Sequence, residues 1–115
     1  MTAAILLVES DPDMAALICD MLARANYAVD GPYATLSDGM EALARSMPAA
    51  AILDVRLQRG DIDLLANDLD VYGIPYLFCA SAFDHRAAKM HPAARLVPET
   101  ALEWALIPTL ESIAH

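Results

Sequence analysis

Acidic residues stand directly after two of the short apolar runs in this sequence. Glu9 and Asp11 follow the run at residues 4–8, and Asp54 follows the run at residues 50–53. If both runs are neighbouring parallel strands, the three carboxylates converge at one end of a sheet, where the ligand sites of such sheets lie. Packed carboxylates repel one another unless a cation joins them, and hard oxygen ligands suit Mg²⁺. The pattern therefore predicts either a magnesium site or a structural set of helix and loop caps.

Five apolar runs recur at intervals of about 20–25 residues, which is the length of one strand and helix unit. They lie at residues 4–8, 27–29, 50–53, 76–79 and 95–97. The first, third and fourth are almost wholly apolar, as expected for strands covered on both faces. Between the runs, apolar residues recur at helical spacing. This alternation predicts an α/β domain with five parallel strands, and in the order 2-1-3-4-5 the first and third strands are neighbours.

Short signals mark where the predicted helices begin. Ser10 or Asp11 can cap the first helix, which has a proline in its first turn. The last helix is predicted to start at a capping box formed by Thr100 and Glu103, and Pro108 inside it should kink or split it. Because Asp11 stands both at a helix start and beside the predicted acidic cluster, both roles stay open for it.

The composition is that of a folded, acidic domain. The chain has 115 residues, 57% of them hydrophobic and 20% charged, which excludes a disordered tail and indicates a single domain over residues 1–115. The 16 acidic residues against 7 lysines and arginines give a net charge of −9. Such a surface repels polyanions, so we expect no binding to nucleic acids or anionic membranes.

Signals for export or membrane insertion are absent from the sequence. No apolar run approaches the roughly 18–20 residues of a membrane span, and the N-terminus lacks the basic start of a signal peptide. Cys19 and Cys79 lie far apart and form no metal-binding or redox motif, so we expect reduced thiols. We therefore expect a cytoplasmic protein.

Three stretches of the chain resemble, in order, parts of the receiver domain of response regulators. Residues 5–14 resemble its opening, residues 51–57 its phosphoacceptor strand and residues 73–78 its fourth strand. The resemblance implies a flavodoxin-like (βα)5 fold, a three-layer sandwich around a parallel sheet of order 2-1-3-4-5. It also implies a stand-alone signalling domain rather than an enzyme, whose partner is a histidine kinase or a phosphotransfer protein.

The same resemblance assigns roles to the acidic cluster. Asp54 matches the aspartate that accepts a phosphoryl group, a transfer that Mg²⁺ assists by neutralising the phosphoryl oxygens. Glu9, Asp54 itself and the backbone carbonyl of Arg56 match metal ligands. Ser10 stands where the family has a second acid that binds the metal directly, so we expect weak Mg²⁺ binding. Asp11 next to it could compensate as a ligand, unless its carboxylate serves as the helix cap.

The chain departs from the receiver pattern at two further functional positions. Ala80 stands where the family has a threonine or serine that binds a phosphoryl oxygen, and Val97 stands where it has a lysine. We therefore expect a degenerate receiver, which takes a phosphoryl group slowly or only binds other proteins. A nearby cation could partly replace the lysine, and the candidates are Arg56, Arg95 and Lys89.

Two other functions stay open beside phosphorelay signalling. The first is a pseudo-receiver, a protein-interaction module in which Asp54 is never phosphorylated. The second is an unrelated flavodoxin-like domain that binds a small molecule, although no glycine-rich phosphate loop follows the first apolar run. Metal dependence discriminates the first alternative from phosphotransfer, and the colour of a bound flavin would reveal the second.

A few residues outside the acidic cluster also invite interpretation. Trp104 lies on the last predicted helix, and in receivers the face made by the fourth helix, the fifth strand and the fifth helix is the usual partner or dimer surface. A homodimer through that face is therefore one expectation, and burial of Trp104 in the core is the other. His85, His91 and His115 show no metal-ligand spacing, and we expect them to be exposed.

Overall fold

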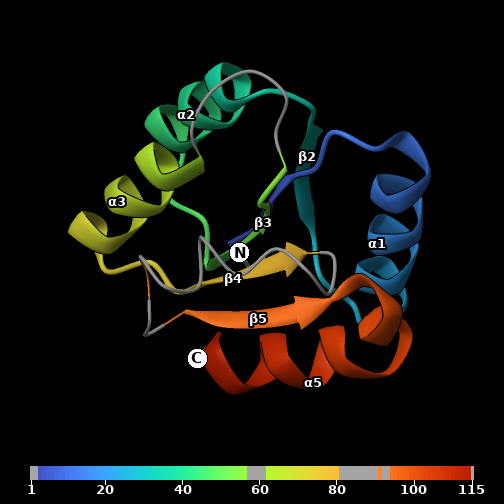
Figure 1. Ribbon diagram of the computed structural model, residues 1–115. Helices are drawn as coiled ribbons and strands as arrows, with labels where there is room; N and C mark the ends of the chain where they lie inside the picture. The colour runs from blue at the N-terminus through green and yellow to red at the C-terminus, as the bar shows by residue number, and fades with distance from the viewer. Residues whose placement is uncertain (1–2, 57–61, 81–90, 92–93, 115) are drawn as a thin grey trace.

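Strands and helices alternate along the chain in the computed structural model, which describes residues 3–56, 62–80, 91 and 94–114 (Figure 1). The strands are β1 (Ile5–Val8), β2 (Val29–Tyr33), β3 (Ala50–Asp54), β4 (Tyr76–Ala80) and β5 (Arg95–Pro98). The helical elements are α1 (Pro12–Arg24), α2 (Leu36–Arg45), α3 (Ile62–Tyr72), a 3₁₀ turn (Glu99–Ala101) and α5 (Leu102–Ile113).

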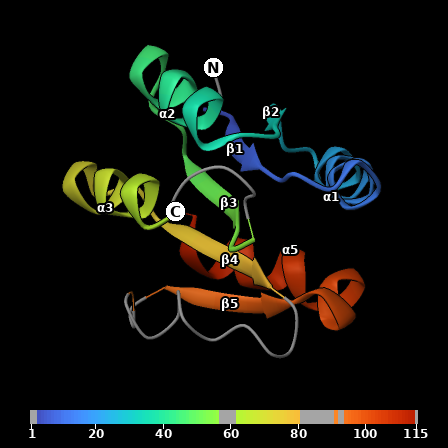
Figure 2. The same ribbon diagram turned by 45° about the horizontal axis from the view of Figure 1, so that its top comes forward.

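The five strands form one parallel sheet in the order β2-β1-β3-β4-β5. Helices α1 and α5 cover one face of the sheet and α2 and α3 cover the other, which gives three layers (Figure 2). The predicted α/β class, three-layer architecture and strand order are confirmed. Because β1 and β3 are neighbours at the centre of the sheet, the residues that follow these two strands meet at one end of it.

Alternate residues of the central strands supply the two halves of the core. Leu7, Ile52 and Leu77 belong to the half under α1 and α5, whereas Leu53 and Phe78 belong to the half under α2 and α3, and all five are buried. Because both faces of these strands are covered, they appear in the sequence as apolar runs. Burial of each such side chain stabilises the fold by roughly 1.5–3 kcal/mol, and the resulting sheet holds the acidic residues in fixed positions.

The start of α1 follows one of the two predicted alternatives. The Oδ1 atom of Asp11 accepts hydrogen bonds from the backbone N–H groups of Asp13 at 2.9 Å and Met14 at 3.3 Å, and Pro12 is the first helical residue. These N–H groups have no carbonyl partner within the helix, which is why a capping side chain stabilises the helix start. Asp11 is therefore the N-cap of α1.

The predicted start of the last helix is wrong. The chain first makes the 3₁₀ turn that contains Thr100, and α5 begins at Leu102 with Ala101 before it and no side-chain cap. Because Thr100 lies inside this turn and Ala101 precedes the first residue of α5, Thr100 does not occupy the N-cap position. Pro108 lies inside one continuous helix, so it does not split the helix.

The second strand begins later than the sequence pattern predicts, at Val29 rather than at residue 27. Asn26 has a positive φ of 66°, and the Tyr27 N–H donates a hydrogen bond to the Leu22 carbonyl at 2.9 Å. These residues complete the end of α1, so pairing with β1 starts only after them.

Candidate functional site

A row of side chains crosses the carboxyl end of the sheet. Asp54, the last residue of β3, pairs in register with Cys79 of β4, which pairs with Val97 of β5. Glu9 follows β1, the neighbour of β3 on the other side. The exposed fractions of Glu9 and Asp54 are only 4% and 3%, and their carboxyl groups interact directly. The structure thus brings together two of the three acids that the sequence predicts to converge.

Hydrogen bonds hold the Asp54 carboxylate in one orientation. The Ser10 hydroxyl donates to Oδ2 at 2.9 Å, and the Ser10 N–H approaches the same oxygen at 3.4 Å. The Arg56 N–H donates to Oδ1 at 2.8 Å. Burial raises the pKa of Asp54, but the contact with Glu9 and these hydrogen bonds outweigh it, so the pKa is lowered. Asp54 is therefore an ionised carboxylate at neutral pH.

Glu9, in contrast to Asp54, keeps its proton at neutral pH. Burial, together with the neighbouring Asp54, raises the pKa of Glu9 to about 8. One oxygen, Oε2, accepts a hydrogen bond from the Asp11 N–H at 3.2 Å. The other oxygen, Oε1, is buried and has no hydrogen-bond partner within the described part of the chain. An unpartnered buried oxygen beside a second carboxylate fits a divalent cation, which would displace the proton and join the two groups.

Asp11 lies at the rim of the site and is engaged by the helix. It lines an open hollow together with Ser10, Pro12, Asp54 and Arg56, but its Oδ1 atom caps α1. Across the described residues, no three histidine, cysteine, aspartate or glutamate side chains are grouped so that they could hold a metal ion. A cation here would therefore depend on backbone carbonyl, hydroxyl and water oxygens in addition to Glu9 and Asp54.

The two positions where receiver domains have a threonine or serine and a lysine carry only apolar groups in this chain. Ala80 is fully buried, and Val97, with an exposed fraction of 1%, packs in the core half beneath α5. Neither side chain has a polar atom to offer a phosphoryl group.

Of the three cations considered as substitutes for the lysine, Arg56 lies at the hollow. Its Nη2 atom donates a hydrogen bond to Oε1 of Glu99 at 2.5 Å. Arg95 starts β5, at the other end of the strand from the acidic row, and Lys89 lies outside the described residues. The structure therefore leaves one described cation beside Asp54, and that cation is already paired.

A buried polar cluster behind β4 is not predicted by any pattern in the sequence. His91, predicted to be exposed, is buried with its Nε2 atom 3.0 Å from Oδ1 of Asp63 and its Nδ1 atom 3.2 Å from the Tyr76 hydroxyl. Tyr76 also donates a hydrogen bond to Asp70 at 3.1 Å. These contacts join α3 to β4 and to residue 91, and no sequence motif marks them. His85 and His115 lie outside the described residues.

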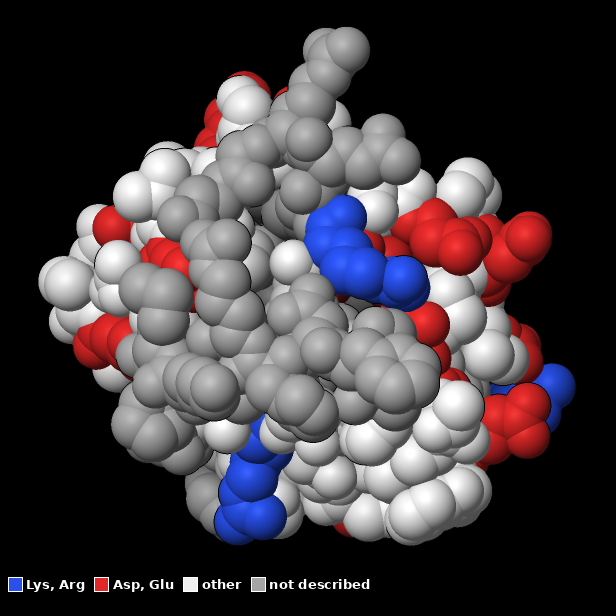
Figure 3. Space-filling model, in the orientation of Figure 1, with Lys and Arg blue, Asp and Glu red and all other residues white. Residues whose placement is uncertain are grey.

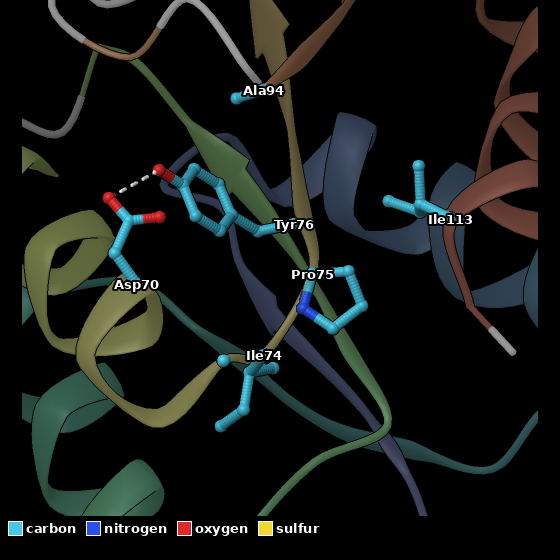
Figure 4. Close-up of a pocket in the computed structure, with 7 residues that line it drawn as sticks. Asp70, Ile74, Pro75, Tyr76, Ala94 and Ile113 are labelled. Atoms are coloured by element: carbon cyan, nitrogen blue, oxygen red, sulfur yellow. Dashed lines mark hydrogen bonds between the residues drawn. The ribbon is translucent and has the colours of Figure 1, made fainter.

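A second hollow, of about 230 Å³, lies at the opposite end of the sheet, where β4 begins (Figure 4). Its lining is largely apolar and includes Ile74, Pro75 and Ile113. Its one carboxylate, Asp70, is the hydrogen-bond acceptor of Tyr76, as the dashed line in Figure 4 shows. Because its polar group is already paired, this hollow is a weaker candidate for chemistry than the acidic one.

The described surface is acidic, and the aromatic side chains of Tyr72 and Trp104 are exposed on it. Figure 3 shows acidic side chains spread over one face, with no broad basic patch among the residues described there. Trp104 on α5 has an exposed fraction of 73%, so it is not a core residue. None of the described helices is both long enough and apolar enough to cross a bilayer.

Comparison with known proteins yields structural matches but no sequence matches. No protein-family model and no curated protein matches the chain. The structure is similar to the receiver domain of the PhyR response regulator of Erythrobacter litoralis, with 22% identity, a TM-score of 0.82 and coverage of 97% of this chain and 89% of that one.

Two further solved structures show the same likeness. The signal receiver domain of a modulated diguanylate cyclase from Desulfovibrio desulfuricans G20 has 21% identity and a TM-score of 0.84, with 100% of this chain and 95% of that one covered. The BeF3-activated N-terminal receiver domain of RstA from Klebsiella pneumoniae has 22% identity and a TM-score of 0.83, with 97% and 98% covered. The chain therefore has the fold of response-regulator receiver domains.

Proposed function

We propose that this chain is a cytoplasmic receiver module of a two-component phosphorelay and that Asp54 accepts its phosphoryl group. The observation that carries the proposal is the state of Asp54: an ionised carboxylate at the end of a central strand, held by Ser10 and the Arg56 N–H, and lining an open hollow. The likeness of the fold to receiver domains supports the same conclusion.

In the proposed reaction, a carboxylate oxygen of Asp54 attacks the phosphorus atom of a phosphohistidine on a kinase or a phosphotransfer protein. The new oxygen–phosphorus bond forms as the nitrogen–phosphorus bond breaks, and its electron pair returns to the donor imidazole. The hydrogen bonds from Ser10 and the Arg56 N–H fix the carboxylate for this attack. Glu9 keeps a second carboxyl group beside the reacting atoms.

Glu9, Asp54 and the Arg56 carbonyl would hold a magnesium ion at this site, and Asp11 is a further acid that lines the same hollow. A bound Mg²⁺ would neutralise negative charge on the phosphoryl oxygens. We propose that it binds weakly, because a neutral hydroxyl at Ser10 replaces an acid and one oxygen of Asp11 caps α1. The Oε1 atom of Glu9, which lacks a hydrogen-bond partner in the described part of the chain, is the feature of this site that favours a cation.

The apolar side chains of Ala80 and Val97 should make the transfer slow. A hydrogen bond to a charged group is worth about 1.5–3 kcal/mol, so the loss of one such contact lowers the stability of the phosphorylated state roughly ten- to a hundred-fold. These losses also support the second candidate, a pseudo-receiver that binds its partners without phosphorylation. In either function, α5 with its exposed Trp104 is a candidate surface for a partner or for a second copy of the chain.

The test is incubation with phosphoramidate or acetyl phosphate, with and without Mg²⁺, followed by intact mass measurement. We expect one added phosphoryl group that requires Mg²⁺ and is absent from the Asp54→Asn variant, which keeps the shape of the side chain. No addition to the parent protein, or equal addition to Asp54→Asn, would sink the phosphorelay function. The pseudo-receiver would then be the better description.

A further inference from the structure

We propose that the Arg56 guanidinium takes the place of the missing lysine, and that it exchanges between Glu99 in the resting protein and the phosphoryl group in the phosphorylated one. This inference rests on the proposed function, because it concerns what happens once Asp54 carries a phosphoryl group. It adds a phosphoryl-binding residue and a route by which the site acts on α5.

The backbone fixes Arg56 beside the acceptor. Its N–H donates to Oδ1 of Asp54 at 2.8 Å, so its Cα cannot move far from the carboxylate. Its side chain lines the same hollow as Asp54 and Ser10 and is 51% exposed. A side chain anchored at its base and half exposed along its length can change partner without disturbing the core.

The present partner of Arg56 is a single carboxylate in an acidic surrounding. Glu99 Oε1 accepts from Nη2, and the charge of Asp54 also acts on the guanidinium. Two carboxylates thus share the one lysine or arginine that lines the described hollow. The resting pair with Glu99 is therefore one of two arrangements open to this cation.

A phosphoryl group on Asp54 would change the competition for Arg56. It brings additional negative charge and terminal oxygens that the planar guanidinium can bind in a bidentate manner. The Glu99 carboxylate would then lose the cation with which it pairs in the resting protein. The loss of this ion pair acts on the first residue of the 3₁₀ turn that leads into α5.

The position of Glu99 allows the exchange of Arg56 between its two partners to be followed by the fluorescence of Trp104. Glu99 directly follows β5 and opens the segment that ends in α5, whose exposed residue Trp104 lies five positions further on. Trp104 is also the only tryptophan in the chain. Its fluorescence therefore reports on the start of α5 without an added label.

The experiment titrates beryllofluoride with Mg²⁺, a mimic of the aspartyl phosphate, into the parent protein and three variants while Trp104 fluorescence is recorded. Arg56→Ala removes the guanidinium but keeps the backbone N–H and carbonyl. Glu99→Gln removes the competing charge and keeps the side-chain shape. Arg24→Ala is the control, because it breaks a surface ion pair, with Asp20 at 3.0 Å, on α1.

We expect Arg56→Ala to weaken beryllofluoride binding about ten- to a hundred-fold and to abolish the Trp104 response even at saturation. Glu99→Gln should tighten binding several-fold, because Arg56 no longer has to leave a carboxylate, and Arg24→Ala should match the parent. Circular dichroism establishes that each variant is folded, and Arg56→Lys, with a cation of different geometry, should restore part of the affinity.

The outcomes separate this inference from the proposed function. If the parent binds beryllofluoride and Arg56→Ala binds it equally well, Arg56 has no such role, although Asp54 still accepts the group. Weaker binding by Glu99→Gln would also overturn the exchange. If the parent binds no beryllofluoride and takes up no phosphoryl group, the proposed function fails and the exchange fails with it.

Discussion

The hydroxyl group of Ser10 donates a hydrogen bond of 2.9 Å to Oδ2 of Asp54. Ser10 occupies the position where receiver domains have a metal-binding acid. This contact orients the Asp54 carboxylate but supplies no charge for a cation. Position 10 is therefore where the chain departs most directly from a magnesium site, although the neighbouring Oε1 atom of Glu9 has no hydrogen-bond partner among the described residues.

Replacement of Ser10 by aspartate should create a stronger Mg²⁺ site. We expect Ser10→Asp to raise the Mg²⁺ affinity about ten-fold or more, since a charged ligand contact is worth about 1.5–3 kcal/mol. Without Mg²⁺ the same variant should be less stable, because three carboxylates would crowd one site. Amide chemical-shift titration with Mg²⁺ measures the affinity, and unfolding in the presence of a chelator measures the stability. The control is Ser10→Asn, and an equal affinity in both variants would contradict the prediction.

The raised pKa of Glu9 should make the metal-free protein less stable as the pH rises. In the folded protein Glu9 has a pKa of about 8, against 4.5 as its ordinary value, so the folded state binds this proton more tightly than the unfolded chain does. The stabilisation is complete below pH 4.5 and is lost as the pH rises through 8, with a slope of up to about 1.4 kcal/mol per pH unit in between. The lowered pKa of Asp54 acts outside this window, below its ordinary value of 3.8.

Urea unfolding at a series of pH values, in the presence of a chelator, tests this dependence. Glu9→Gln carries no titrating proton, so we expect a flatter profile and a higher unfolding free energy than the parent at pH 8. If the profiles of parent and variant run parallel between pH 5 and 8, Glu9 does not hold its proton in the folded protein.

Removal of the His91 ring should destabilise the protein. The ring is buried, with one nitrogen 3.0 Å from Asp63 and the other 3.2 Å from the Tyr76 hydroxyl, and it contacts the ring of Phe78. We expect His91→Ala to lower the unfolding free energy by about 2–4 kcal/mol, through lost hydrogen bonds and a cavity. Tyr76→Phe removes one hydroxyl and should cost about 1 kcal/mol. A similar cost for the two variants, measured by urea unfolding, would show that the ring contributes little.

A lysine introduced at position 97, where receiver domains carry one, should strengthen the proposed phosphoryl site. Val97 lies in the same row as Asp54, with Cys79 between them, so a long side chain from position 97 can extend toward the Asp54 carboxylate. We expect Val97→Lys to tighten beryllofluoride binding about ten-fold or more through a charge-assisted contact. It should also lower stability, because the position is buried. Val97→Met has a similar length without the charge and should not gain affinity; a gain in both variants would contradict the charge argument.

Local patterns in the sequence were sufficient to predict the frame of the site. The apolar runs and the helical spacing between them predict the α/β class, and the strand order predicts that Glu9 and Asp54 meet. The Asp11 cap was predictable for the same reason, since it depends on N–H groups two and three residues away. The wrong start of α5 shows the limit of such signals, because the turn after β5 overrides the capping pattern at Thr100.

The sequence by itself determined which residue types stand at the ends of the strands, because strand and helix periods depend on neighbours a few positions apart. It therefore determined that an acceptor-like Asp54 is present and that Ala80 and Val97 carry no polar group. Only the tertiary structure decided which partners these residues have. The pairing of Arg56 with Glu99 and the burial of His91 against Asp63 join residues 43 and 28 positions apart. Such contacts depend on sheet register and on the paths of the connecting segments, which no local period encodes.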